Sequence, residues 1–301
     1  KHGVEGFAAS LHNTVILPYL VRHGTEEQKK KYLPKLVSGE LVSAIAMTEP
    51  GVGSDLQSVT TTALKDGNGY RINGAKTYIS NGQTADFIIV VAKTDPNERA
   101  KGISLMLLET EGAEGFQRGK KLDKIGLDAS DTSELFFDDV FVPAENVLGG
   151  EEGKGFYQLM GELPQERLII AMGAMTGIEK ALETTLDFVK NRKAFGQTIW
   201  DFQNTQFVMA DLKARATAAK IFVNDCIAKH LKRELDVPTA CMAKYWVTEL
   251  QGEVVDKCLQ FHGGAGFIND YPIARMYRDS RITRIFGGSN EVMKMVIARS
   301  M

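Results

Sequence analysis

A glycine-rich segment, residues 46–55, contains residue types that could bind a planar or phosphate-bearing ligand. It follows the apolar run of residues 41–47 and reads Ala-Met-Thr-Glu-Pro-Gly-Val-Gly-Ser-Asp. Glycines let backbone N–H groups approach such a ligand, and the hydroxyls of Thr48 and Ser54 can bond ring heteroatoms or phosphate oxygens. On spacing alone the simpler interpretation is a turn that ends a strand, and a binding loop is the alternative.

A carboxylate near the start of a long helical pattern is of a residue type that could transfer a proton. Glu166 precedes Arg167 and the apolar run of residues 168–171. A carboxylate can remove a weakly acidic proton when burial raises its pKa. Most helix glutamates are solvated, so from the residues alone an exposed Glu166 is the simpler interpretation. Glu162 lies one helical turn earlier and could share the same face.

Residues 191–197, Asn-Arg-Lys-Ala-Phe-Gly-Gln, offer a charged group for an anionic ligand. The Arg192 guanidinium can donate two parallel, charge-assisted hydrogen bonds to a diphosphate. The competing interpretation is a helix C-terminus at which Arg192 and Lys193 stabilise the dipole. The glycines of residues 263–266 likewise favour a helix C-cap, and a structural role is favoured for His262.

Three zones of different periodicity must position these residues. Short helices run to about residue 39, and residues 25–28 form a capping-box pattern before the helix that carries Tyr32 and Leu36. Residues 41–150 contain short β-type runs between Gly, Asp and Asn, which predict a compact antiparallel β domain. The runs are residues 59–63, 70–72, 87–91, 103–108 and 135–142. Residues 65–69, Lys-Asp-Gly-Asn-Gly, indicate a hairpin.

From residue 152 onward, apolar residues recur at spacings of three and four. The pattern predicts long antiparallel helices over residues 155–192, 200–231 and 236–262. Pro164 lacks an N–H, which predicts a kink that helps aim Glu166, or alternatively the start of a new helical segment. The α, β, α order argues against a Rossmann unit, and no G-x-G-x-x-G segment in the right context indicates nicotinamide binding.

Composition argues against several functions. The 36 Lys and Arg residues nearly balance 38 Asp and Glu residues, so there is no bulk attraction to nucleic acid or anionic lipid. No apolar run approaches the ~20 residues of a membrane span, and the first residues carry no signal-peptide pattern. Cys226, Cys241 and Cys258 lack metal-like spacing, which indicates reduced, buried thiols in an intracellular protein and no metal site.

Residues 46–55 and 284–291 together resemble the flavin loop and the active-site loop of the acyl-CoA dehydrogenase family. The second loop reads Arg-Ile-Phe-Gly-Gly-Ser-Asn-Glu. Residues 76–82, 191–197 and 260–267 resemble further family segments in the same order, so the resemblance covers about residues 6–301. Residues 162–168 and 240–246 are most similar to the long-chain acyl-CoA dehydrogenases.

The resemblance implies that one part of an FAD site lies in the β domain. It assigns to this part Met47, Thr48, Gly53, Ser54, Tyr78 and Ser80. In the family, the position of Thr48 bonds the pyrimidine side of the flavin, and that of Ser54 lies near the phosphates and the CoA arm. Tyr78 takes the place of the aromatic residue that covers the ring, and Ser80 takes the place of the residue that bonds N5.

The resemblance also implies FAD contacts across a subunit boundary. It assigns to them Arg192, Phe195, Gln203, Gln260 and Gly264. The positions of Arg192 and Phe195 hold the diphosphate and adenosine of the neighbouring subunit's FAD in the family. These contacts imply a homotetramer.

The active-site loop lacks the family's usual catalytic glutamate, because Gly287 stands at that position. Gly287 can still donate its N–H to the substrate thioester, but the space beside it must be filled. In the isovaleryl and long-chain branches the glutamate precedes an arginine on a helix, as Glu166 precedes Arg167. The resemblance therefore implies that Glu166 is the base, with Glu162 ranked second. It implies acyl-CoA contacts at Ser54, Arg167, Phe286 and Gly287. It also implies FAD contacts at Ser289 and Glu291. The simplest interpretation of Glu291 is a helix acid favoured by the dipole.

The expected fold is α+β, with a partial N-terminal helical region (1–40), a central antiparallel β domain (41–150) and a C-terminal long-helix bundle (151–301). Because the chain opens at Lys1 in what reads as a buried helix over residues 6–18, we expect that the first N-terminal helices of the family precede it.

The expected function is FAD-dependent α,β-dehydrogenation of a long-chain fatty acyl-CoA to trans-2-enoyl-CoA. Electrons would pass to an electron-transfer flavoprotein, in the bacterial cytoplasm or the mitochondrial matrix. One alternative is a branched-chain enzyme of the isovaleryl or citronellyl type. The other is a catalytically silent subunit that binds FAD or acyl-CoA, which Gly287 and the short N-terminus suggest.

Overall fold

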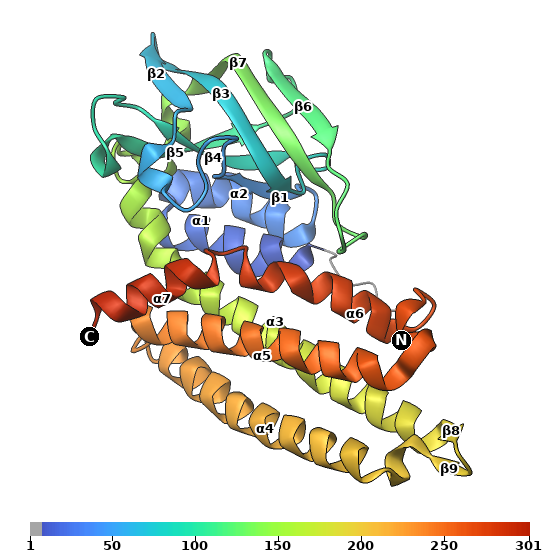
Figure 1. The fold of residues 1–301 in the computed structure, drawn as a ribbon. Helices are drawn as coiled ribbons and strands as arrows, with labels where there is room; N and C mark the ends of the chain where they lie inside the picture. Colours follow the sequence, from blue (N-terminus) through green and yellow to red (C-terminus); the bar gives the residue numbers. More distant parts are fainter. Residues whose placement is uncertain (1–7) are drawn as a thin grey trace. The chain divides into compact units, whose positions relative to one another are not determined.

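The computed structural model describes residues 8–301, so residues 6–7 of the expected first helix lie outside the described residues. These residues form two compact units. One comprises residues 8–124 and 128–162, and the other comprises residues 125–127 and 163–301. The first contains the sheet and the N-terminal helices, and the second is mostly helical (Figure 1). The three-part division expected from the sequence stays a prediction.

The N-terminal helices begin the first unit. A π-helical turn, Leu11–Ile16, leads into α1 (Leu17–His23), and α2 spans Glu26–Ser38. The predicted capping box is confirmed: the Gln28 N–H donates to Thr25 Oγ1 (3.2 Å), and the Thr25 N–H donates to Gln28 Oε1 (3.0 Å). Two backbone N–H groups at the start of α2 are thereby satisfied.

The β domain is confirmed, and its sheet is mixed rather than purely antiparallel. Its strands are β1 (Ser43–Ala46), β2 (Thr62–Asp66), β3 (Gly69–Ser80), β4 (Phe87–Lys93), β5 (Ile103–Glu109), β6 (Phe116–Lys121) and β7 (Thr132–Pro143). They run in the order β1-β4-β2-β3-β7-β6, with β5 on β4. The β1–β4 pair is parallel because the intervening β2–β3 hairpin gives the chain room to return in the same direction. The predicted hairpin turn at residues 67–68 is confirmed.

The central strand β4 separates two apolar cores, since alternate side chains of a strand point to opposite faces. Phe87, Ile89 and Val91 pack with α1 and α2, and the ring centroids of Tyr32 and Phe87 are 4.8 Å apart. Ile88 and the other even-numbered residues of β4 pack inside the sheet with residues of β3 and β7. The sheet is therefore buried on both faces around β4.

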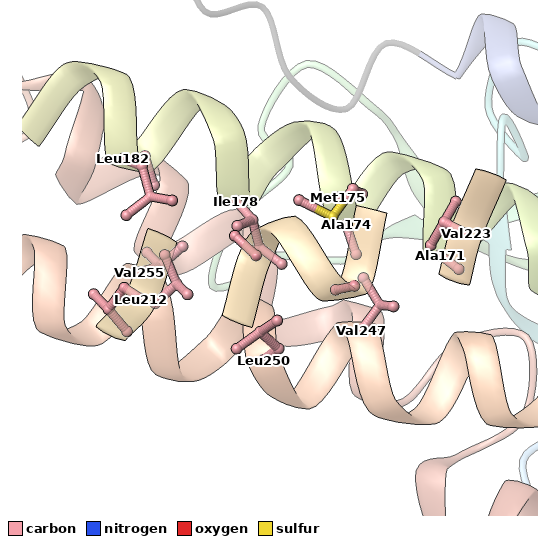
Figure 2. Close-up of a cluster of buried hydrophobic side chains, with 14 of the residues drawn as sticks. Ala171, Ala174, Met175, Ile178, Leu182, Leu212, Val223, Val247, Leu250 and Val255 are labelled. Atoms are coloured by element: carbon pink, nitrogen blue, oxygen red, sulfur yellow. The ribbon is translucent and has the colours of Figure 1, made fainter. Parts of the chain in front are cut away.

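The second unit is built from the long helices that the sequence predicted. Its helices are α3 (Gly155–Asn191, beginning in the first unit), α4 (Gln203–Leu231), α5 (Val237–His262), α6 (Pro272–Ser280) and α7 (Asn290–Arg299). Alanines, leucines and valines of α3, α4 and α5 form one buried cluster (Figure 2). Helix α3 is unbroken at Pro164, so the alternative of a new segment there is wrong, while the kink stays a prediction.

Short elements complete the fold. A hairpin of β8 (Lys193–Ala194) and β9 (Gln197–Thr198) joins α3 to α4. Short 3₁₀ turns lie at Leu56–Ser58, Ala100–Gly102, Ala144–Asn146, Leu148–Gly150, Ile199–Asp201, Gly263–Phe267 and Arg281–Arg284. All three cysteines are buried free thiols, as predicted. Among residues 8–301, no helix combines the length and apolar character needed to cross a membrane.

Candidate active site

The structure brings the glycine-rich loop of the first unit next to strand β3. The Thr77 N–H donates to the Thr48 carbonyl (2.9 Å), and Lys76 Nζ donates to the Met47 carbonyl (3.0 Å). These bonds fix the backbone of Met47 and Thr48 beside Tyr78, although the two segments are about thirty residues apart in the chain. The sequence predicted both segments as parts of one ligand site, and the geometry supports that grouping.

Tyr78 has an unusual backbone for an aromatic residue. Its φ is +60°, it lies where the β3–β7 register shifts between Lys76 and Ile79, and it is 68% exposed. A left-handed conformation at such a residue costs about 1–3 kcal/mol and is concentrated at functional sites. The bulge turns the Tyr78 ring outward, whereas Ser80, two residues later, is half-buried. An exposed ring held in a strained bulge is suited to cover a planar ligand.

A buried ion pair that the sequence analysis missed supports this loop. Lys76 Nζ lies 2.9 Å from Glu49 Oε1, and both side chains are almost completely buried. Glu49 also accepts hydrogen bonds from Thr60 and Thr61. Burial raises the pKa of Glu49, but the Lys76 charge and these bonds outweigh it and lower the pKa to about 2. The buried Lys76–Glu49 ion pair therefore holds the backbone of the loop in place.

The tip of the loop is open. Glu49 and Val52 exchange two backbone hydrogen bonds (2.8 and 3.1 Å) around a tight turn, beyond which Gly53 and Ser54 are exposed. A Cβ added to Gly53 would meet no atom within 4 Å, and its φ is not positive. Because the fold itself does not demand glycine at this position, close approach of a ligand to the backbone is a reason for it.

Glu166 and Arg167 are buried in the second unit. They are 8% and 5% exposed, which contradicts the simpler expectation of a solvated helix glutamate. Arg167 Nη1 lies 3.3 Å from Cys241 Sγ, while Arg167 Nε is a buried donor without a hydrogen-bond partner among residues 8–301. Such a donor is costly unless a ligand satisfies it. This fits the predicted contact of Arg167 with a substrate.

Glu162, the second-ranked base, is buried in the first unit and already engaged. Its carboxylate accepts hydrogen bonds from Arg22 Nη1 (2.8 Å) and interacts with His23 Nε2 (2.9 Å). These contacts give Glu162 a structural role, and the ranking of Glu166 above it stays a prediction.

Gly287 packs closely against the end of the Ile170 side chain. Its φ is +64°, and a Cβ built there would lie 2.3 Å from Ile170 Cδ1. The space that the sequence analysis expected another group to fill is thus occupied by Ile170, one helical turn after Glu166. Within the described chain the Gly287 N–H donates to no protein acceptor, so it remains available to a substrate carbonyl.

The residues that flank Gly287 include an exposed aromatic ring and the start of α7. Phe286 is 41% exposed. Ser289 caps α7, where its Oγ accepts the Val292 N–H (3.4 Å). Backbone and Ser289 hydrogen bonds lower the pKa of Glu291, which lies in the first turn of α7 as expected for a helix acid.

The residues predicted to meet a neighbour's FAD lie at one end of the helical unit and are exposed. They are Arg192, Phe195, Gln203, Gln260 and Gly264. Phe195 is 95% exposed with a φ of +53°, so its ring projects from the β8–β9 turn. The rings of Phe188 and His262 stack at 4.2 Å, which joins the C-terminal ends of α3 and α5. His262 is buried and bonded to the Cys258 carbonyl (2.9 Å), in keeping with a structural role.

Comparison with known families identifies the class of protein. Residues 2–40 match the acyl-CoA dehydrogenase N-terminal domain, residues 44–140 the middle domain and residues 153–301 the C-terminal domain. The chain belongs to the acyl-CoA dehydrogenase family, which consists of FAD-binding oxidoreductases that act on CH–CH bonds.

Two relatives within the family are similar to this chain over nearly its whole length. The chain is 50% identical to the mitochondrial long-chain specific acyl-CoA dehydrogenase of Sus scrofa, over 97% of this chain and 68% of the relative. It is 41% identical to the mitochondrial isovaleryl-CoA dehydrogenase of Pongo abelii, over 99% of this chain and 70% of the relative.

Solved structures confirm the predicted fold. An acyl-CoA dehydrogenase from Geobacillus kaustophilus superposes with a TM-score of 0.96 at 48% identity, covering 98% of this chain and 78% of that one. Butyryl-CoA dehydrogenase from Megasphaera elsdenii gives a TM-score of 0.93 at 39% identity, covering 98% of this chain and 77% of that one.

Proposed function

We propose that this protein catalyses the FAD-dependent α,β-dehydrogenation of a long-chain acyl-CoA to trans-2-enoyl-CoA, with Glu166 as the catalytic base. The observation that carries the assignment of the base is the burial of Glu166 on the helix whose Ile170 packs against Gly287, a residue that itself offers no carboxylate. Glu166, one turn before Ile170 on α3, is a buried carboxylate on a helix that packs against this loop.

The residues present fit FAD. The exposed Tyr78 ring can cover the planar flavin, and the open backbone at Gly53 can approach its phosphates. On the helical unit, the exposed Arg192 fork and the projecting Phe195 ring match a diphosphate and an adenine. The exposure of Tyr78 and Gly53 supports the FAD contacts assigned to the β domain. The exposure of Arg192 and Phe195 supports those assigned to the helical unit.

In this mechanism the chain binds, polarises and deprotonates the substrate. The Gly287 N–H donates to the thioester carbonyl, which makes the α-proton more acidic. Glu166 then takes the α-proton. FAD held beside Tyr78 and Ser80 would supply the acceptor for the hydride that leaves the β-carbon. Arg167, with its unsatisfied Nε, contacts the CoA portion.

Sequence identity favours a long acyl chain over a branched one. The long-chain specific relatives from three mammals are 48–50% identical, and the isovaleryl-CoA dehydrogenases are 37–41% identical. The branched-chain alternative is the second candidate because those relatives align over 99% of this chain. Comparing kcat/KM for palmitoyl-CoA and isovaleryl-CoA decides between them.

We infer that electrons pass to an electron-transfer flavoprotein and that the active protein is a homotetramer. One structural neighbour, at 38% identity and a TM-score of 0.93, is described as the electron transferring flavoprotein of Acidaminococcus fermentans. The exposed Arg192 and Phe195 support contacts with a second subunit's cofactor, since large exposed aromatic rings are enriched at interfaces.

Substitution of Glu166 tests the proposal. Glu166→Gln is expected to lower turnover of palmitoyl-CoA by at least about 10³-fold while FAD content is unchanged, because the amide cannot accept the proton. The matched control is Glu179→Gln, an exposed glutamate of the same helix that pairs with Lys220. Full activity of Glu166→Gln would contradict the assignment, and a wild-type protein that binds FAD without turnover would indicate the silent subunit.

A further inference from the structure

Lys244 of α5 is completely buried, and no carboxylate of residues 8–301 forms an ion pair with it. Its Nζ donates to the Gly288 carbonyl (2.8 Å) and to Asn290 Oδ1 (2.9 Å). Lys76, the other fully buried lysine of the described chain, has the Glu49 carboxylate at 2.9 Å. A buried ammonium bonded to neutral oxygens is costly, so its presence calls for a specific reason.

The charges around Lys244 increase this cost. Burial, followed by the positive charge of Arg167 on α3, lowers the pKa of Lys244 to about 8. Glu249 on the same helix and Glu291 on α7 offset part of this effect. Lys244 nevertheless donates to both acceptors, so its Nζ is held at the Gly288 carbonyl.

A second set of bonds orients the acceptors of Lys244. Asn290 is 1% exposed, and its Nδ2 donates to Glu249 Oε1 (2.7 Å) and Thr248 Oγ1 (3.0 Å). The Asn290 amide oxygen therefore faces Lys244. Glu249 Oε2 also accepts from Arg284 Nη1 (3.4 Å), so one carboxylate holds a residue on each side of the glycine turn.

Arg284 reaches Glu249 because residue 252 is glycine. A Cβ at Gly252 would lie 2.7 Å from Arg284 Nη2 and 2.9 Å from its Cζ. The guanidinium thus lies directly against the backbone of α5. The turn between Arg284 and Asn290 is anchored to one helix at both ends and at the Gly288 carbonyl between them.

We propose that Lys244 is a positioning residue for the dehydrogenation: it fixes the Gly287–Gly288 turn through the Gly288 carbonyl, so that the Gly287 N–H stays aimed at the substrate. This inference rests on the proposed function for its catalytic consequence. Both glycines have positive φ, +64° and +92°, and such a turn has few side-chain contacts of its own to hold it. Lys244 supplies a constraint within the turn itself, at the Gly288 carbonyl, in addition to those at its two ends.

The test compares Lys244→Met with Lys220→Met in the FAD-loaded protein. Lys220 is a half-exposed lysine of α4 that pairs with Glu179 and serves as the matched control. In Lys244→Met, amide hydrogen exchange over residues 285–291 should rise roughly tenfold, because the bond to Gly288 is lost. The kcat for palmitoyl-CoA should fall by about 10²-fold, with KM changed by less than about threefold, as for loss of one oriented donor. Lys220→Met should change neither.

A second variant keeps the proposal testable if Lys244→Met does not fold. Lys244→Gln replaces the ammonium by a neutral, shorter amide that is easier to bury, and should raise exchange over the same residues because the bond to the Gly288 carbonyl is lost. Unchanged exchange in either folded variant would overturn the role of Lys244. A wild-type protein that turns over no acyl-CoA would contradict the proposed function instead, and the exchange measurement would still decide whether Lys244 fixes the turn.

Discussion

The Cδ1 atom of Ile170 lies 2.3 Å from the position that a Cβ of residue 287 would occupy. A contact this short means that the end of the Ile170 side chain would have to shift if residue 287 carried a side chain. Ile170 of α3 therefore lies where a side chain of residue 287 would begin, and Glu166 is a buried carboxylate on the same helix.

Restoring a glutamate at position 287 should therefore destabilise the protein. Gly287→Glu is expected to lower the free energy of unfolding by about 1–3 kcal/mol, through its positive φ and the clash with Ile170. Urea unfolding measures the change. In an Ile170→Ala background the cost of Gly287→Glu should be smaller, as a double-mutant cycle would show. An equal cost in both backgrounds would mean that the two positions do not compete.

Glu162 should matter for stability and not for chemistry. Glu162→Gln weakens the contacts with Arg22 and His23, so we expect a loss of about 1 kcal/mol, limited because Arg22 is 42% exposed. Turnover per bound FAD should stay within about twofold of wild type. A variant that retains FAD but has lost turnover would move the role of base from Glu166 to Glu162.

Acid should weaken the first unit through Glu49. Its pKa is lowered from 4.5 to about 2 in the folded protein, so the folded state binds fewer protons than the unfolded state between these values. The stabilisation is complete above about pH 4.5 and is lost as the pH falls toward 2.

Removing both partners of this ion pair isolates its contribution. Between pH 5 and 3, Glu49→Gln/Lys76→Met should lose about 1–3 kcal/mol less than wild type in urea unfolding. The double variant is preferable because Glu49→Gln alone would leave Lys76 buried without its partner. Identical pH slopes in the two proteins would show that Glu49 is not the group that titrates.

The ring of Tyr78 should help to bind FAD, while its strained backbone lowers the stability of the flavin-free protein. Tyr78→Gly relieves the positive φ and should stabilise the flavin-free protein by about 1 kcal/mol, while FAD content after purification falls. Tyr78→Phe keeps the ring and should retain FAD. If the glycine variant holds FAD as well as wild type does, the ring does not cover the cofactor.

Local patterns in the sequence predicted much of the fold because they act over short distances. The spacing of apolar residues located α3, α4 and α5 to within a few residues, and Thr25 and Gln28 form the predicted capping box. Strand β6 was missed because Phe116–Lys121 is an edge strand rich in polar residues, without apolar alternation.

The sequence predicted which residues belong to the candidate site, but not which buried residues hold them in place. The resemblance named Thr48, Tyr78, Glu166 and Gly287, and the structure shows what holds Thr48 and what packs against Gly287. The burial of Lys76 and Lys244 carries no local signal, because a lysine in a sequence is most often on the surface. The contact between Ile170 and Gly287 joins residues 117 positions apart, and no spacing rule reaches that far.

The measurement that tests the central claim most directly is the visible spectrum of the FAD-loaded protein, mixed anaerobically with palmitoyl-CoA. In the absence of an electron acceptor, dehydrogenation must bleach the oxidised flavin band. We expect rapid bleaching in wild type and a persistent band in Glu166→Gln at equal FAD content. Bleaching of the Glu166→Gln protein at the wild-type rate would contradict the account.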